Sequence, residues 1–282
     1  MSNSLSPIKS NLADQTKYLL RKYKLRAKKS LGQNFLINSS VLAEIVEAAE
    51  LRKSDVILEV GSGLGTLTRV LANQVQEVIA LEKDSRLVEV LTAELSDFAN
   101  VSLLNEDARS FLLNKERSFN KVVANLPFYL TSPLINRLIN LSPPLELIVL
   151  MVQKEVAERI CARPPKSNRL AVLCQLQAEC QIVSRIPAKS FHPTPAVDAA
   201  VLRIKSFGSL PDPFLVELVN AGFSSPRKTL ANNFATHFNV SRSQLEQCGF
   251  NGKIRAEALA LEDWRKIKNC FLDNKNVIIR PR

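Results

Sequence analysis

The most informative run of this 282-residue chain is Ile57-Leu58-Glu59-Val60-Gly61-Ser62-Gly63-Leu64-Gly65. Its first half is almost continuously apolar, which is typical of a strand buried on both faces of a sheet. Three of the chain's eight glycines then fall within five residues. Glycine permits a tight turn and leaves no Cβ between the backbone and a ligand. The run therefore predicts a strand, a loop and a helix that bind a nucleotide-type cofactor, or else a turn that only packs a strand against a helix.

Short apolar runs alternate with amphipathic helical patterns on both sides of this run. Helical spacing begins near Ser39, Leu64, Ser85 and Ser132. Because buried strands that alternate with helices form a sheet covered on both faces, we predict an α/β fold with a parallel sheet. The expected strands cover residues 56–60, 77–81, 101–104, 121–124, 145–152, 182–186 and 199–204.

The strand pattern ends at Pro211 and Pro213, and only helical patterns follow. Helices are expected over residues 214–223, 227–238, 241–248 and 256–271, besides two earlier ones over 153–161 and 170–180. Near the N-terminus, residues 18–23 can place their apolar side chains on one face of a short helix. We therefore predict three parts, which are a flexible basic arm with a short helix (1–28), an α/β domain (29–207) and a helical domain (208–282).

Positive charge is concentrated at the two ends of the chain. The 38 Lys and Arg exceed the 27 Asp and Glu, which gives a formal net charge of +11. Residues 1–30 hold 8 basic and 1 acidic side chains, residues 205–282 hold 12 and 7, and the segment between them is nearly neutral. Clustered Lys and Arg attract polyanions such as nucleic acid. We expect a near-neutral catalytic body between two cationic ends that bind a polyanion; a basic tail that only maintains solubility is the alternative.

Several protein classes are excluded by missing features. Residues 1–9 contain no apolar stretch that would act as a signal peptide, and the longest apolar run, 147–152, is far too short to span a bilayer. We expect a cytoplasmic protein that does not enter a membrane. The five cysteines include no C-x-x-C pair, so neither a disulfide framework nor a thiolate zinc site is expected. Only two histidines are present, neither near a second ligand in sequence, so we expect no metal.

Two carboxylates follow the next two expected strands. Glu82 lies 21 residues after Gly61, where the acidic residue of dinucleotide folds accepts the hydroxyls of a ribose. Asp107 follows the third strand, where a carboxylate can accept a hydrogen bond from an adenine amino group. NAD sites favour G-x-G-x-x-G, but Thr66 stands where the last glycine is needed, whereas S-adenosylmethionine tolerates G-x-G-x-G. Both cofactors fit the loop alone, and the fourth strand distinguishes them.

The fourth strand ends in Asn125-Leu126-Pro127-Phe128. An adenine exocyclic amine is a weak nucleophile, and the Asn125 side-chain oxygen together with the Leu126 carbonyl can accept its two N–H bonds. Pro127 stiffens the turn, while Phe128, together with Tyr129, offers a ring on which an extruded base can stack. Methyl transfer from a sulfonium depends mainly on alignment, so the lack of a nearby Cys or His nucleophile fits S-adenosylmethionine.

These motifs resemble those of the bacterial small-subunit rRNA adenine dimethyltransferases, the KsgA/RsmA group. The resemblance extends from about Lys28 to Leu272 and includes the segments 29–36, 106–108, 191–198, 227–230 and 255–257. It implies a seven-stranded, Rossmann-like methyltransferase sheet with a small all-α C-terminal domain that binds RNA. It also implies a monomer that uses S-adenosylmethionine, releases S-adenosylhomocysteine and dimethylates two adjacent adenosines near the 3′ end of 16S rRNA in the pre-30S subunit.

The resemblance also implies roles for individual residues. The tetrad 125–128 is expected to be the catalytic centre. The side chains expected to hold the target base are Phe128, Tyr129 and Phe191. The residues expected to contact the cofactor are Asn34, Leu36, Gly61, Gly63, Glu82, Asp107 and Asn125.

Two other functions stay open. The related large-subunit rRNA adenine methyltransferases that confer macrolide resistance share the cofactor site and often have phenylalanine in the tetrad. Leu126, where that group usually has isoleucine, and the segment 255–257 stand against them. A non-catalytic ribosome-assembly factor is disfavoured because Glu82, Asp107 and Asn125 are all present.

Overall fold

The computed structural model describes residues 11–113, 118–127, 131–238 and 240–273. The chain divides into two compact units, the first comprising Met1–Ala157 and Gln181–Lys205 and the second comprising Glu158–Cys180 and Ser206–Arg282. The three-part division made from the sequence stays a prediction, and these units differ from it in grouping residues 158–180 with the C-terminal helices. Among the described residues, no helix has the length and apolar character needed to cross a membrane.

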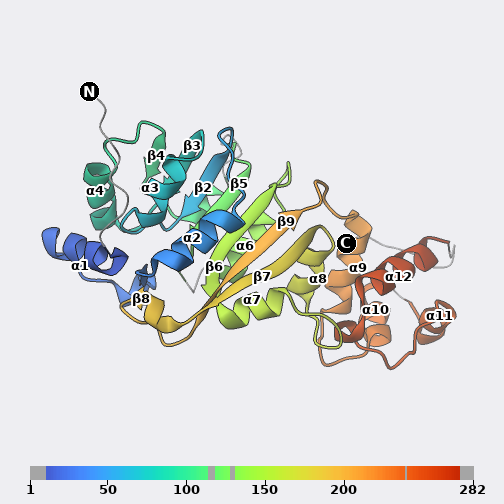
Figure 1. Ribbon diagram of the computed structural model, residues 1–282. Helices are drawn as coiled ribbons and strands as arrows, with labels where there is room; N and C mark the ends of the chain where they lie inside the picture. The colour runs from blue at the N-terminus through green and yellow to red at the C-terminus, as the bar shows by residue number, and fades with distance from the viewer. Residues whose placement is uncertain (1–10, 114–117, 128–130, 239, 274–282) are drawn as a thin grey trace. The chain divides into compact units, whose positions relative to one another are not determined.

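A seven-stranded sheet organises the first unit (Figure 1), which confirms the predicted α/β class. The strand order is β4-β3-β2-β5-β6-β9-β7. The first five strands in this order, β4, β3, β2, β5 and β6, pair in parallel, and β9 is antiparallel to β6. The bounds are β2 (Val56–Val60), β3 (Glu77–Leu81), β4 (Val101–Leu104), β5 (Lys121–Asn125), β6 (Leu147–Gln153), β7 (Ala178–Ile186) and β9 (Ala199–Ser206).

Helices cover the sheet because its central strands are apolar on both faces. Strands β5 and β6 are buried along nearly their whole length. On one face, Ile45 of α2 and Leu71 of α3 join a core cluster with the strand residues Val78, Val149 and Val201. The helices of this unit are α2 (Ser39–Ala48), α3 (Thr66–Ala72), α4 (Ser85–Glu94), α5 (Ala108–Phe111) and α6 (Thr131–Leu138), and α7 (Lys154–Ile160) follows β6.

The N-terminal segment contains the predicted short helix, α1 (Leu12–Lys22). Its buried side includes Leu19, which packs in a cluster with Phe35, Leu64, Leu87 and Val90. Beyond its end, the Tyr23 hydroxyl donates a hydrogen bond of 2.7 Å to Glu94 of α4. The flexibility predicted for the arm therefore does not apply to α1, because an apolar face and a hydrogen bond hold it on the first unit.

The second unit is built from helices, as predicted. Its core contains Trp264 and Phe271, with ring centroids 5.8 Å from Phe223 and 5.6 Å from Phe234, respectively. A Cβ on Gly222 would lie 2.4 Å from the Trp264 ring, so only glycine fits there. The helices are α8 (Arg169–Gln175), α9 (Pro213–Gly222), α10 (Leu230–Phe238), α11 (Arg242–Gln247) and α12 (Leu261–Asp273).

The helix predicted over 170–180 extends too far. Helix α8 ends at Gln175, and Ala178 already belongs to β7. The backbone carbonyl of Gln177 accepts a hydrogen bond of 2.9 Å from the Phe207 N–H. The apolar residues of this stretch suit a helix or a buried strand equally well, and pairing with a distant segment decides between them.

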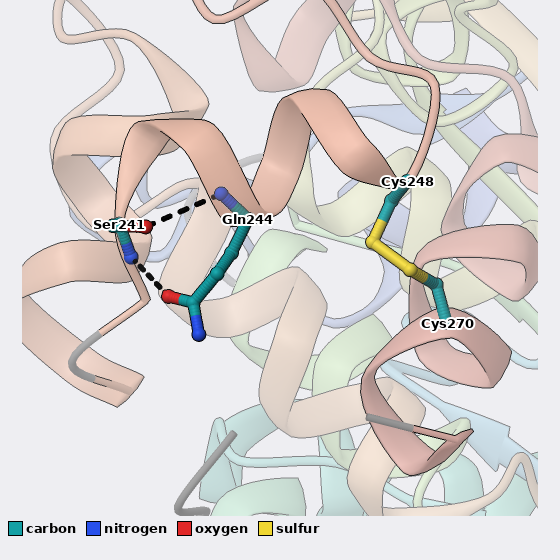
Figure 2. Close-up of a disulfide and its surroundings, with 4 residues drawn as sticks. All are labelled: Ser241, Gln244, Cys248 and Cys270. Atoms are coloured by element: carbon teal, nitrogen blue, oxygen red, sulfur yellow. Dashed lines mark hydrogen bonds between the residues drawn. A yellow bond between two sulfur atoms is a disulfide. The ribbon is translucent and has the colours of Figure 1, made fainter. Parts of the chain in front are cut away.

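A disulfide joins Cys248 to Cys270 in the second unit (Figure 2), so the prediction of no disulfide is wrong. The two Cα atoms are 5.9 Å apart, and the bond links the end of α11 to α12. At its start, α11 has a capping box in which Ser241 and Gln244 satisfy each other's backbone N–H groups. The cysteines are 22 positions apart and meet only through helix packing, which spacing alone does not reveal.

Candidate active site

The glycine loop after β2 requires its glycines. Gly61, Gly63 and Gly65 have φ angles of +77°, +60° and +76°, in the left-handed region that favours glycine. The Gly61 N–H donates a hydrogen bond of 2.8 Å to the Leu81 carbonyl, which ties the loop to the end of β3. A Cβ on Gly61 would lie 3.4 Å from the Pro127 ring. The loop therefore lies directly against the Asn-Leu-Pro turn.

A pocket lies at the carboxyl ends of β2, β3 and β5, and the predicted site residues meet there. Predicted cofactor residues that line it are Asn34, Leu36, Gly61, Gly63, Glu82, Asp107 and Asn125. Leu126, Pro127 and Phe191 line it as well. Phe128 and Tyr129 lie outside the described residues. The structure thus brings the described candidates together, and their contacts with a cofactor or a base stay predictions.

Glu82 is held in place by two backbone N–H groups. Its Oε2 accepts from the Gly63 N–H at 3.0 Å, and its Oε1 accepts from the Asp84 N–H at 2.8 Å. The residue is 8% exposed, and burial raises the pKa of its carboxyl although these hydrogen bonds oppose the change. A carboxylate fixed in this way keeps lone pairs for hydroxyl donors of a ligand.

Asp107 caps α5 and is surrounded by cations. Its Oδ1 accepts from the Arg109 backbone N–H at 2.9 Å and from Arg109 Nε at 3.0 Å. Its Oδ2 accepts from Arg109 Nη2 at 2.8 Å and from Lys83 Nζ at 3.0 Å. The Arg109 guanidinium holds the pKa of this carboxyl well below its usual range. Because these bonds use the acceptor sites of both oxygens, binding of an adenine amine requires one of the two exposed cationic side chains to move.

Asn125 ends β5 and faces the segment just before β1 (Phe35–Leu36). Its Nδ2 donates to the backbone carbonyl of Asn34 at 3.4 Å. Asn34 Nδ2 in turn donates to the Gly32 carbonyl at 3.1 Å. The neighbouring Leu126 N–H donates to the Met151 carbonyl at 3.1 Å, which anchors the turn to β6. With the amide nitrogen of Asn125 directed at Asn34, its side-chain oxygen points away from that segment.

A two-stranded sheet brings Phe191 into the pocket. Strand β1 (Phe35–Leu36) is antiparallel to β8 (Phe191–His192), and Leu36 is the partner of Phe191. Phe191 is 2% exposed and still lines the pocket. Strands of two residues have no periodicity, so no sequence pattern indicates this pairing.

Glu59 is a pocket residue to which sequence reasoning assigned no role. It is 1% exposed within β2, and its Oε2 has no hydrogen-bond partner among the described residues. The pKa of Glu59 is raised to about 7, mainly because the carboxyl is buried; the hydroxyls of Thr68 and Ser62 oppose this change, and the nearby Glu82 charge adds to it. The detectable signal was a carboxylate inside an otherwise apolar strand.

The pocket fits a cofactor that carries a ribose and a cationic group. The glycine loop leaves room where side chains would otherwise stand, Glu82 is fixed beside it, and an unpartnered carboxylate oxygen of Glu59 lies in the wall. Within the described ranges, no group of three or more His, Cys, Asp and Glu residues is arranged to hold a metal ion.

Comparison with known proteins identifies the family. Residues 24–273 match the family model described as ribosomal RNA adenine dimethylase. The chain belongs to the ribosomal RNA adenine dimethylase family. This dimethylase-family chain is 35% identical over 272 residues to the ribosomal RNA small subunit methyltransferase A of Clostridium botulinum, an alignment that covers 92% of this chain and 98% of that protein.

Two crystal structures share the fold of this family member. A dimethyladenosine transferase from Plasmodium falciparum has a TM-score of 0.72 at 27% identity and covers 87% of this chain and 100% of its own. The 23S rRNA methyltransferase ErmE has a TM-score of 0.70 at 26% identity and covers 86% of this chain and 100% of its own. The fold of the dimethylase family is thus shared by a protein named as a dimethyladenosine transferase and by one named as a 23S rRNA methyltransferase.

Proposed function

We propose that this family member dimethylates the exocyclic amines of two adjacent adenosines near the 3′ end of 16S rRNA, with S-adenosylmethionine as methyl donor. The observation that carries the proposal is the meeting of the glycine loop, Glu82 and the Asn125–Pro127 turn in one pocket. The near full-length similarity to a protein named as a small-subunit methyltransferase supports the choice of substrate.

Several pocket residues suit S-adenosylmethionine. When bound, this cofactor supplies a methyl group attached to a sulfonium sulfur. Glu82 would accept hydrogen bonds from the ribose hydroxyls, because Gly63 and Asp84 already orient its carboxylate. Asp107 would accept a hydrogen bond from the adenine amino group once the side chain of Lys83 or Arg109 has moved aside. Asn34, Leu36 and Gly61 form the remaining wall.

The turn after β5 orients the target adenine. The side-chain oxygen of Asn125 and the carbonyl of Leu126 accept the two N–H bonds of the amine, which makes the nitrogen lone pair available. Pro127 fixes the turn against Gly61, and Phe191 closes the pocket beside Leu36. Stacking by Phe128 and Tyr129 is part of the proposal from sequence alone. Correct alignment of the reacting atoms supplies on the order of 7–11 kcal/mol of the rate acceleration in reactions of this kind.

Cationic surfaces at both ends of the chain suit an RNA partner. On α1 and just after it, Lys17, Arg21 and Lys24 are exposed on the unit that also holds the glycine loop, and the C-terminal helices carry further Lys and Arg. We assign RNA-phosphate contacts to both regions. A cytoplasmic monomer that acts on the pre-30S subunit, without metal or membrane, completes the proposal.

The large-subunit enzymes are the second candidate because the fold does not exclude them. The ErmE structure, at a TM-score of 0.70, is nearly as similar as the Plasmodium dimethyladenosine transferase at 0.72.

To separate the candidates, the protein is incubated with methyl-labelled S-adenosylmethionine and, in separate reactions, immature small subunits, large-subunit rRNA or duplex DNA. Label in the small subunits alone is expected. Label in large-subunit rRNA would support the rival, and binding without label transfer would indicate an assembly factor.

A further inference from the structure

Asp84 is a buried carboxylate at the start of α4 with no task in the function proposed above. It is 3% exposed and follows Glu82 by two residues. Its side chain caps α4 by accepting the Arg86 N–H at 3.3 Å. A helix cap needs only one such bond, so the other contacts of this carboxylate need a separate explanation.

The Asp84 carboxylate holds the segment that leads into β1. Its Oδ2 accepts from Gln33 Nε2 at 2.9 Å, and its Oδ1 lies 3.4 Å from Lys28 Nζ. Gln33 Oε1 accepts from the Lys28 backbone N–H at 2.7 Å, so the turn is closed on itself. Arg86 completes the cluster with bonds of 3.0 and 2.6 Å to the two carboxylate oxygens. The Arg86 guanidinium holds the pKa of Asp84 well below its usual range, so the group stays charged.

Both residues of the Asp84–Gln33 hydrogen bond are connected to residues that line the pocket. On one side, the Asp84 N–H donates to Glu82 Oε1 at 2.8 Å. On the other side, Gln33 immediately precedes Asn34, whose carbonyl accepts from Asn125 Nδ2. Asp84 itself is not among the residues that line the pocket. It therefore contacts two residues that line the pocket, Gln33 through its carboxylate and Glu82 through its backbone N–H, without lining the pocket itself.

We infer that Asp84 is a positioning residue that assembles the cofactor pocket by holding the Gln33–Leu36 segment against the wall formed by Glu82. The inference rests on the proposed function, because it takes S-adenosylmethionine as the ligand. The pocket is built from segments far apart in the chain, and the Asp84–Gln33 hydrogen bond joins two of them. Charge-assisted hydrogen bonds of this kind contribute more than neutral ones because the acceptor is ionised.

The test is the affinity for S-adenosylmethionine alone, measured by titration calorimetry on the full chain. Asp84→Asn keeps the cap of α4, since Asn caps helices as well as Asp does, but weakens the contacts to Lys28 and Gln33. We expect the dissociation constant to rise about ten-fold. At saturating cofactor, kcat and the KM for RNA should stay within about two-fold of wild type, because bound cofactor itself orders the segment.

Glu94→Gln is the matched control. Glu94 lies on the same helix and also binds an N-terminal segment, through Lys22 and Tyr23 at 2.7 Å each, but it does not contact residues 28–36 in the bonds described. Its replacement should leave cofactor affinity within about two-fold of wild type. An equal decrease of affinity in both variants would overturn the specific role of Asp84.

A double-mutant cycle with Gln33→Ala tests the contact itself. If Asp84 acts through Gln33, the double variant should bind cofactor about as weakly as either single variant. Additive decreases in affinity, or an Asp84→Asn dissociation constant within about two-fold of wild type, would overturn the inference. A lower Tm and kcat with unchanged affinity would also overturn it, because that pattern indicates structural support only. If Asp84→Asn does not fold, Gln33→Ala alone decides by the same criterion. Failure of the wild-type protein to bind S-adenosylmethionine would instead overturn the proposed function.

Discussion

Asn125 lies at the end of β5, between the Asn34 backbone carbonyl that accepts its side-chain N–H and Gly61 of the glycine loop. Sequence reasoning found it because the carboxyl ends of parallel strands meet at one edge of a sheet. The same rule predicted that Gly61, Glu82 and Asp107 would lie at this edge, and all three line the same pocket as Asn125. Glu59 and Asp84 were missed for different reasons. Glu59 is a carboxylate inside an apolar strand, a signal visible in the sequence that was assigned no role. The importance of Asp84 comes from burial and from contacts with distant residues, which its cap position in the sequence does not report.

Replacing Asn125 with Ala tests the tetrad. The variant lacks the acceptor for the target amine, so turnover at saturating cofactor should fall about 100-fold or more, while much of the RNA affinity is retained. Initial rates with labelled cofactor and separate binding titrations measure both quantities. Asn140→Ala, at an exposed position, serves as the control and should behave as wild type. Full activity of the Asn125→Ala variant would remove the tetrad from the mechanism.

Glu59 should make stability depend on pH. Its pKa is about 7 when folded, against 4.5 as the ordinary value, so the folded protein holds the extra proton between these two pH values. Stability from this group is therefore present at low pH and lost as the pH rises toward 7, by about 3 kcal/mol in total. Glu59→Gln should remove this pH dependence, which urea unfolding at pH 5.5 and pH 8 would reveal. Glu89→Gln, an exposed carboxylate on α4, should leave the pH dependence as in wild type, and a wild-type dependence in Glu59→Gln would contradict the assignment.

Among the elements, the long strands and helices were predictable from the sequence. The two-residue strands β1 and β8 and the disulfide were not. All seven strands of the main sheet overlap the apolar runs that predict them. The pattern is most continuous in central strands such as β5 and β6, which are buried on both faces, whereas the edge strand β7 alternates between more and less exposed residues. The β1–β8 pair has two residues a strand and depends on long-range contact. The Cys248–Cys270 disulfide likewise depends on how α11 packs on α12. Such features arise from tertiary structure and leave no local pattern.

The disulfide should stabilise the second unit. It closes a loop between positions 22 apart, and cross-linking a loop of that size contributes about 3 kcal/mol by restricting the unfolded chain. Reductant should lower the Tm of the wild-type protein toward that of Cys270→Ser and should not change the Tm of that variant. Cys161→Ser replaces a free cysteine and should keep the sensitivity to reductant. A wild-type Tm that does not respond to reductant would contradict this role.

At the scale of the whole molecule, the structure shows where part of the N-terminal positive charge lies. The basic N-terminal region includes a docked helix, α1, which presents Lys17 and Arg21 on its exposed side while Leu19 is buried. An RNA partner would therefore meet cations held on the cofactor-binding unit. The acidic and basic residues of the middle segment largely balance each other, so attraction of RNA is assigned to the ends of the chain.

Removing charge from α1 without undocking it tests this assignment. Lys17→Gln combined with Arg21→Gln should weaken RNA binding and reduce the magnitude of the salt slope by about 0.7 for each RNA phosphate that the variant no longer neutralises. Binding titrations between low and moderate salt measure the slope. Lys53→Gln, an exposed lysine before β2, is the control that removes the same kind of charge elsewhere. A slope that is the same in wild type and both variants would assign the α1 charges to solubility.

The most direct test of the central claim is mass spectrometry of the RNA product. Immature small subunits that lack the modification are incubated with the protein and S-adenosylmethionine, and their rRNA is digested and sequenced by fragment mass. The proposed function predicts dimethyladenosine at two adjacent positions near the 3′ end, and none with Asn125→Ala. Unmodified small-subunit rRNA, or dimethyladenosine in large-subunit rRNA instead, would contradict it.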